Sequence, residues 1–141
     1  MTDEELVAKK LAFIETCLRE LRQLARPAEL STDIREQRFV EHTLQLAVQA
    51  ALDVASHIVS EERLGEPATN RDLFDRLARA HWIPRELGDR ISNMAGFRNI
   101  LVHGYIDVDL LIILDVLANH LGDLDAYVGA IRTSSGRRPE G

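Results

Sequence analysis

Residues 44–59 of the chain read LQLAVQAALDVASHIV, and this stretch decides which class of fold the chain can adopt. Drawn as a helix, the segment is apolar around most of its circumference, which is typical of a helix at the centre of a domain. We therefore expect one long helix from about Ile34 to about Arg63, with the other elements packed around it.

The preceding segment has the same helical spacing. Thr2 and Glu5 fit the two ends of a capping box, and Pro27 is expected to end this helix. Its apolar residues recur every three or four positions: Val7, Leu11, Ile14, Leu18, Leu21 and Ala25. No segment of useful length alternates with a period of two, so the prediction is an all-α protein.

Three more helices are expected after the central one. A short helix is predicted over residues 71–82, and Pro84 suits the first turn of a fourth helix. Asp107 or Asp109 is expected to cap a fifth helix. The apolar residues of that fifth helix form one unbroken stripe: Leu110, Leu114, Leu117, Leu121, Leu124, Val128 and Ile131. The short connections favour an up-and-down bundle of about five helices.

The composition limits the possible classes of protein. With 141 residues, of which 45% are hydrophobic, the chain has the size of one domain, expected over residues 1–132. Residues 133–141, TSSGRRPEG, lack apolar side chains and are predicted to be a disordered tail. The first residues do not resemble a signal peptide, and charge interrupts the longest apolar run. We therefore expect a soluble, cytoplasmic protein that does not enter a membrane.

The charged and sulfur-containing residues narrow the choice further. Cys17, the only cysteine, lies on an apolar helix stripe, so a core position is expected, without a disulfide or a thiolate metal site. A net charge of -6 argues against a protein that coats nucleic acid non-specifically. A local basic groove remains compatible, because fifteen of the seventeen basic residues are arginines, which bind phosphate through a planar fork.

Residues 96–109, GFRNILVHGYIDVD, place polar groups that are costly to bury in an apolar helical run. Arg98 occupies a core-type position, so its guanidinium must be paired or must face a groove or an interface. His103 lies about 140° around a regular helix from Arg98. The two can meet if Gly104 ends the helix, or if a two-fold dimer brings in a second copy of the motif.

Residues 98–105, RNILVHGY, resemble the R-x4-H-x-Y motif of HepT-like toxins in the HEPN superfamily of ribonucleases, and the resemblance covers nearly the whole chain. It implies a HEPN helical bundle that works as a homodimer, with the motifs facing each other, and that cleaves RNA without a metal ion or another cofactor. It also implies a partner, a minimal nucleotidyltransferase antitoxin that transfers AMP to the motif tyrosine, Tyr105.

The residue types fit this chemistry. His103 can act as base or acid near neutral pH, and Arg98 can hold a phosphate through two parallel hydrogen bonds. Asn99 is a candidate to orient His103 or to contact phosphate. Asp53 and His57, four residues apart on one face of the central helix, are candidates to fix the side chains of the motif. Two such residues are too few for a metal site.

Plainer interpretations stay open for the same residues. Tyr105 could pack with its hydroxyl bonded to the backbone, and Arg98 could form a structural ion pair with Asp53. The polar line on the central helix could be a solvated face: His42, Gln45, Gln49, Asp53, Ser56 and Ser60. Three functions follow from these choices: a ribonuclease toxin, a non-catalytic helical partner of a nucleotidyltransferase, or an interaction bundle.

Overall fold

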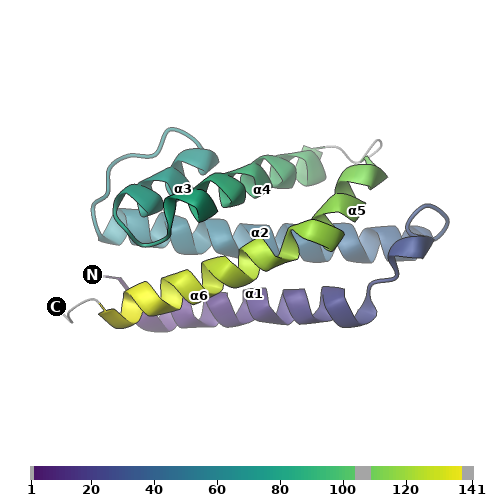
Figure 1. Cartoon of the computed structure of the whole chain (residues 1–141), viewed down its shortest axis with the longest axis horizontal. Helices are drawn as coiled ribbons and strands as arrows, with labels where there is room; N and C mark the ends of the chain where they lie inside the picture. Colours follow the sequence, from purple (N-terminus) through teal and green to yellow (C-terminus); the bar gives the residue numbers. More distant parts are fainter. Residues whose placement is uncertain (1, 104–108, 138–141) are drawn as a thin grey trace.

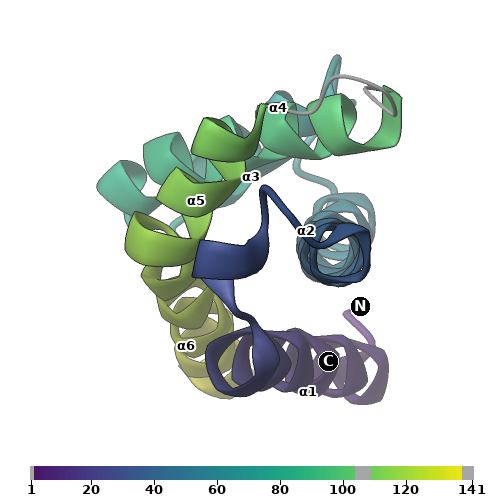
Figure 2. The same cartoon turned by 90° about the vertical axis from the view of Figure 1, so that its right-hand side faces the viewer.

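The long helix α2 (Ile34–Glu61) lies between α1 (Glu4–Leu24) on one side and the pair α3 (Asn70–Arg79) and α4 (Arg85–His103) on the other (Figures 1 and 2). The computed structural model describes residues 2–103 and 109–137, of which 99–103 are described as helix backbone. The buried residues of α2, among them Leu44, Ala50, Leu52 and Ile58, spread over more than half of its circumference. The prediction of a central helix is confirmed.

The chain continues through α5 (Leu110–Asn119) into α6 (Leu121–Arg137), which packs against α1 and α4. The long segments α1, α2, α4 and α5–α6 run alternately up and down, as Figure 1 shows. A single 3₁₀ turn, Pro27–Glu29, lies between α1 and α2. The described part of the chain contains helices and no strand, so the all-α prediction is confirmed, with six α-helices in place of about five.

The start of α1 differs from the predicted capping box. The helix begins at Glu4, and the carboxylate of Asp3 accepts a hydrogen bond from the Leu6 amide at 3.1 Å. The Thr2 hydroxyl instead donates to Glu62 at the end of α2, at 2.7 Å, and Glu5 pairs with Lys9. The cap is thus one residue later than expected, because Asp accepts the same amide hydrogen bond as Thr and competes for that position.

The predicted fifth helix is broken at His120. Asp109 caps α5 as expected, accepting from the Leu111 amide at 2.9 Å. The ring nitrogens of His120 lie 3.0 Å from Asp115 and 3.3 Å from Asp123, one carboxylate on each side of the break. The apolar stripe continues across the break, so periodicity alone does not reveal a change of direction confined to one residue.

The last helix also extends beyond the expected domain boundary. It ends at Arg137, five residues into the segment 133–141 that was expected to be a tail. The Ser134 hydroxyl donates to the Trp82 carbonyl at 2.8 Å and fixes this end of α6 to the loop before α4. Residues 138–141 lie outside the described part of the chain. The expected boundary after residue 132 therefore does not mark the end of the helix.

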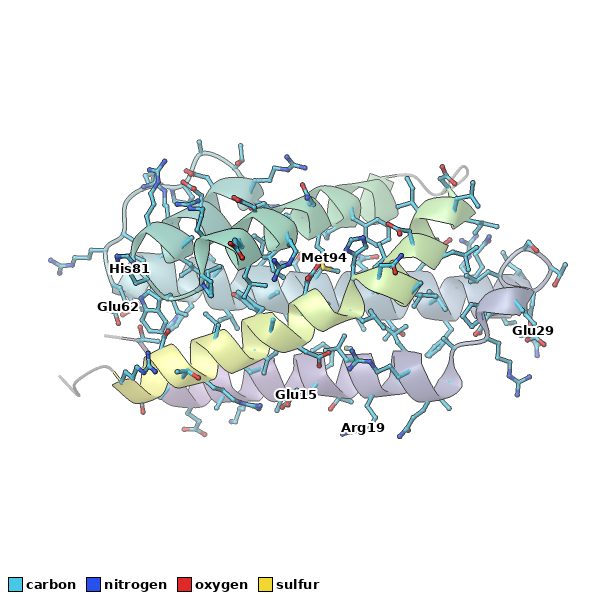
Figure 3. The ribbon with its side chains drawn as sticks, viewed as in Figure 1. Glu15, Arg19, Glu29, Glu62, His81 and Met94 are labelled. Atoms are coloured by element: carbon cyan, nitrogen blue, oxygen red, sulfur yellow. The ribbon has the colours of Figure 1, made fainter. Side chains whose placement is uncertain are left out.

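Several contacts hold α6 in the bundle. Its Arg132 donates to Glu15 on α1, with 2.9 Å between Nη1 and Oε2; Glu15 is labelled in Figure 3. Tyr127 is fully buried, and its hydroxyl donates to the Ala51 carbonyl of α2 at 2.8 Å. The Tyr127 ring meets the ring of Phe74 on α3 edge to face, with centroids 5.6 Å apart. One side chain thus connects α2, α3 and α6.

Cys17 is buried among the apolar residues of α1, as expected, and burial raises the pKa of its thiol to about 11. Such a thiol stays protonated and behaves as a small core side chain. Within residues 2–103 and 109–137, no helix is both long and apolar enough to cross a membrane.

Replacing Tyr127 with Phe removes the hydroxyl and keeps the ring. We expect the free energy of unfolding to fall by about 1 kcal/mol, the usual contribution of one internal hydrogen bond. Urea unfolding at a fixed protein concentration measures this change. Tyr127→Leu, which also removes the contact with Phe74, should cost more. Equal stability of Tyr127→Phe and the parent would show that the bond to Ala51 contributes nothing.

Candidate active site

Helix α4 carries the polar motif and extends beyond the part that α3 covers. The helix begins directly after Pro84, whose carbonyl accepts from the Gly88 amide at 3.0 Å, so Pro84 precedes the first turn rather than lying in it. Helix α3 runs antiparallel to the first half of α4. The last turns of α4 continue past the start of α3 (Figure 1). The motif therefore begins beyond the part of α4 that α3 covers.

Arg98 is partly buried in the position where the apolar stripe of α4 would continue. Met94 and Phe97 next to it are buried, and Met94 lies on the inner side of α4 (Figure 3). The Nε atom of Arg98 is buried and has no hydrogen-bond partner among the described residues. Leaving such a donor unpaired costs about 1–3 kcal/mol. A group with an acceptor oxygen is therefore expected to complete this position.

The other motif residues follow on the same helix. Asn99 and His103 lie in the last turns of α4, whose backbone is described as far as His103. Tyr105 lies outside the described residues. The roles assigned to the side chains of Asn99, His103 and Tyr105 therefore stay predictions.

Asp53 and His57 have their partners on α1 instead of α4. Lys10 forms an ion pair with Asp53 at 3.2 Å, and the Gln49 side chain donates to the same carboxylate at 2.9 Å. The Nε2 atom of His57 accepts from the Asp3 amide at 2.9 Å, so this nitrogen carries no proton.

No ion pair joins Arg98 and Asp53 among the described residues; the Asp53 carboxylate contacts Lys10 and Gln49 instead. The role of Asp53 and His57 in fixing the motif side chains stays a prediction, because the side chains of Asn99 and His103 lie outside the described part of the chain. The contacts toward α1 follow from the position of the helices: α1 and α4 lie on different sides of α2 (Figure 2). A face of α2 that meets α1 therefore does not meet α4.

The polar line on α2 is neither fully solvated nor fully paired. His42, Ser56 and Ser60 are exposed, whereas Gln45 and Gln49 are partly buried. The Gln49 carbonyl oxygen Oε1 is buried without a hydrogen-bond partner among the described residues. The interpretation as a solvated face thus holds for the two ends of the line and fails at Gln49.

A groove runs between α4 and α5 toward the motif. Its volume is about 190 Å³, and Met94, Phe97, Ile112 and Val116 form its apolar lining, with His120 among the polar groups at one end. Ile112 and Leu111, in the first turn of α5, are 38% and 74% exposed. An exposed apolar patch thus lies at the end of the bundle where α4 ends (Figure 1).

Sequence reasoning did not single out Arg71, in the first turn of α3. Its guanidinium lies against the backbone of α4 at Gly96, where an added Cβ would come within 3.1 Å of Nη2. Residues 71 and 96 are far apart in the sequence, so only the fold brings them together. A glycine inside a helical pattern, seven residues before the motif histidine, is the one sequence signal that could have pointed to a close approach at this position.

Among the side chains described for residues 2–98 and 109–137, no three or more His, Cys, Asp or Glu gather in a way that could hold a metal ion. The available chemistry in the described region is that of a guanidinium next to a helix end that carries a histidine.

The sequence of the chain is similar to those of known ribonucleases. The family model described as ribonuclease HepT-like matches residues 14–131. An mRNA nuclease HepT of Shewanella oneidensis is 32% identical over 129 residues, covering 91% of this chain and 97% of that protein. A tRNA nuclease HepT of Aphanizomenon flos-aquae is 37% identical over 78 residues, which are 55% of this chain and 53% of that one.

The fold of the chain is also similar to that of solved structures. The tri-AMPylated HEPN toxin of Shewanella oneidensis, solved in complex with its MNT antitoxin, superposes with a TM-score of 0.84 at 32% identity. The match covers 94% of this chain and 99% of the toxin. The chain therefore belongs to the HepT-like family of ribonucleases.

Proposed function

We propose that the chain is the toxin of a toxin–antitoxin pair and that it cleaves RNA through Arg98 and His103 without a metal ion. The observation that carries the proposal is the motif R-x4-H-x-Y, whose arginine and histidine lie in the last turns of α4, in a chain of a ribonuclease family, with a buried Arg98 Nε that lacks a partner among the described residues. The relatives named as mRNA and tRNA nucleases support an RNA substrate.

The chemistry needs three contributions. The 2′-oxygen of the ribose attacks the phosphorus and the bond to the 5′-oxygen breaks, which leaves a cyclic phosphate and a free 5′-hydroxyl. His103 takes the 2′ proton, and a second acid returns a proton to the leaving oxygen. Arg98 holds the non-bridging oxygens, where negative charge accumulates in the transition state. Asn99 orients His103 or contacts the phosphate.

A homodimer would complete this site. One motif offers one histidine, whereas two motifs facing each other would supply a separate base and acid. The exposed Leu111 and Ile112 beside the motif end are apolar surface that a second copy could cover. A second copy or an RNA phosphate would also offer an acceptor to the buried Arg98 donor.

We further propose that a minimal nucleotidyltransferase neutralises the toxin by adding AMP to Tyr105. The solved Shewanella toxin is tri-AMPylated and bound to its antitoxin, which supports this form of control. The phosphate of an adenylate on Tyr105 would occupy the Arg98 clamp as an RNA phosphate does, and the nucleoside would block access.

Replacing His103 with Ala should lower the rate of RNA cleavage at least about 100-fold, because general acid–base catalysis contributes that much or more. The test uses purified protein, cellular RNA and an excess of chelator. His81→Asn is the matched control, since His81 lies at the opposite end of the bundle and asparagine tolerates its left-handed backbone, with φ of 61° (Figure 3).

Circular dichroism must show that the His103 variant is folded. Cleavage at the parent rate by folded His103→Ala protein would refute the assignment of His103. Absence of cleavage by the parent under all conditions would favour the non-catalytic helical partner of a nucleotidyltransferase.

The second expected outcome concerns the oligomeric state. Sedimentation velocity at micromolar concentration should show a dimer, and Leu111→Asp, which places a charge on the apolar patch, should shift it toward monomer. Leu24→Asp is the control, because Leu24 is 59% exposed at the end of α1. A monomeric parent would exclude the paired-histidine mechanism.

The third expected outcome concerns Tyr105. With ATP, magnesium and the cognate nucleotidyltransferase, the intact mass should rise in multiples of one adenylate and cleavage should stop. The chain has one other tyrosine, Tyr127, whose hydroxyl is buried against Ala51, so peptide mapping should find the adenylate at Tyr105 alone. Tyr105→Phe should escape modification and keep activity. Adenylate at another residue would contradict the proposal.

A further inference from the structure

Arg71 is held against α4 just before the motif. The Ser92 hydroxyl of α4 approaches the Arg71 carbonyl at 3.5 Å, so the first turn of α3 sits on α4 at this level. The guanidinium lies over Gly96, with Nη2, Nε and Cζ at 3.1, 3.7 and 3.8 Å from the position of an added Cβ. Glycine costs about 1 kcal/mol relative to alanine inside a helix, and here its missing Cβ leaves room for the guanidinium.

The charge of Arg71 is not neutralised by a described neighbour. Eight of the fourteen arginines in the described part of the chain have a carboxylate partner: Arg22 with Asp125, Arg26 with Glu29, Arg38 with Glu41, Arg76 with Asp72, Arg79 and Arg85 with Asp75, Arg90 with Asp123, and Arg132 with Glu15. Within the described residues, Arg71 is exposed and forms no ion pair or side-chain hydrogen bond. The nearby Asp72 accepts from the Ala68 amide and from Arg76 instead.

Helical register connects this cation to the motif. His103 is seven residues after Gly96, which is almost two full turns, so the two positions lie on the same face of α4, about 10 Å apart along its axis. Arg98, two residues after Gly96, lies about 160° around α4 from Gly96, on the other side of the helix. A strand that follows this side of α4 would pass Arg71 before it reaches His103.

We infer that Arg71 binds a phosphate of the RNA strand next to the one that is cut, and so helps to position the substrate. This inference rests on the proposed function, because it takes RNA as the ligand. A planar guanidinium without an acidic partner, supported by helix backbone, is suited to grip phosphate oxygens. It would supply affinity without base specificity, since phosphate contacts carry no sequence information.

The salt dependence of RNA binding tests the inference. Binding of a fluorescein-labelled single-stranded oligoribonucleotide is measured by anisotropy across a salt series, with His103→Ala protein that does not cut. Adding Arg71→Ala should weaken binding about tenfold, as expected for one lost charge-assisted hydrogen bond. It should also reduce the slope of log K against log salt by about 0.7, the value for one phosphate on a single strand.

Two further variants test whether the position of Arg71, and not only its charge, matters for RNA binding. Arg79→Ala removes the same charge from the other end of α3, where Arg79 is paired with Asp75, and should leave affinity and slope unchanged. Gly96→Ala should weaken binding part of the way, because the new Cβ displaces the flexible end of Arg71 while the helix itself gains stability. In the cutting protein, Arg71→Ala should raise KM and leave kcat near the parent value.

The results distinguish failure of the inference from failure of the proposed function. If the parent cuts RNA and Arg71→Ala binds with the parent affinity and slope, Arg71 has no role in binding and the inference is wrong. If Arg71→Ala weakens only the complex with the nucleotidyltransferase, the residue is a protein contact and the inference is also wrong. If the parent neither binds nor cuts RNA, the proposed function fails and the inference falls with it.

Discussion

The apolar circumference of α2 is the constraint on which the rest of the structure depends. Leu44, Ala50, Leu52 and Ile58 are all buried and spread over more than half of the circumference of α2, so no single neighbouring helix could cover all of them. Helix α1 therefore packs on one side and the α3–α4 pair on another, and α6 reaches α2 through Tyr127. Because α3 is short, α4 continues beyond it toward the motif (Figure 1).

The ion pairs of the chain are also distributed unevenly among the helices. The ion pairs Arg22–Asp125 and Arg132–Glu15 connect α1 with α6. Arg98 and Arg71, on or against α4, have no acidic partner among the described residues. A chain with a net charge of -6 can therefore still carry local positive charge on and beside α4. Retaining an unpaired guanidinium in an apolar stripe costs stability, and such costs are concentrated at functional sites.

Much of the fold could be predicted from apolar periodicity, because a stripe such as that of α2 depends on local sequence alone. The cap at Asp3 and the break at His120 could not, since Thr2 is an equally good cap and the stripe runs through the break. Residues 133–137 lack apolar side chains, yet Ser134 ties this part of α6 to Trp82 through a polar contact that periodicity does not register.

In the candidate site, too, some residues could be predicted from local sequence and others depend on how the helices pack. The motif itself is local, so Arg98, Asn99, His103 and Tyr105 could be nominated from sequence. Their neighbours depend on which helix covers which face. Because of the orientation of α2, Asp53 contacts Lys10 of α1 and His57 contacts the Asp3 amide at its start. The antiparallel packing of α3 on α4 brings Arg71 to Gly96, although 25 positions separate the two residues in the sequence.

The chemical ends of the RNA fragments test the central claim most directly. Purified protein would cut a defined RNA in the presence of chelator, and mass spectrometry would identify both ends at each cleavage site. Attack by the 2′-oxygen, with Arg98 and His103 as catalytic groups, predicts a cyclic or terminal phosphate on the 3′ side and a free 5′-hydroxyl. Fragments with a 3′-hydroxyl and a 5′-phosphate, formed only when a divalent metal is present, would contradict the account.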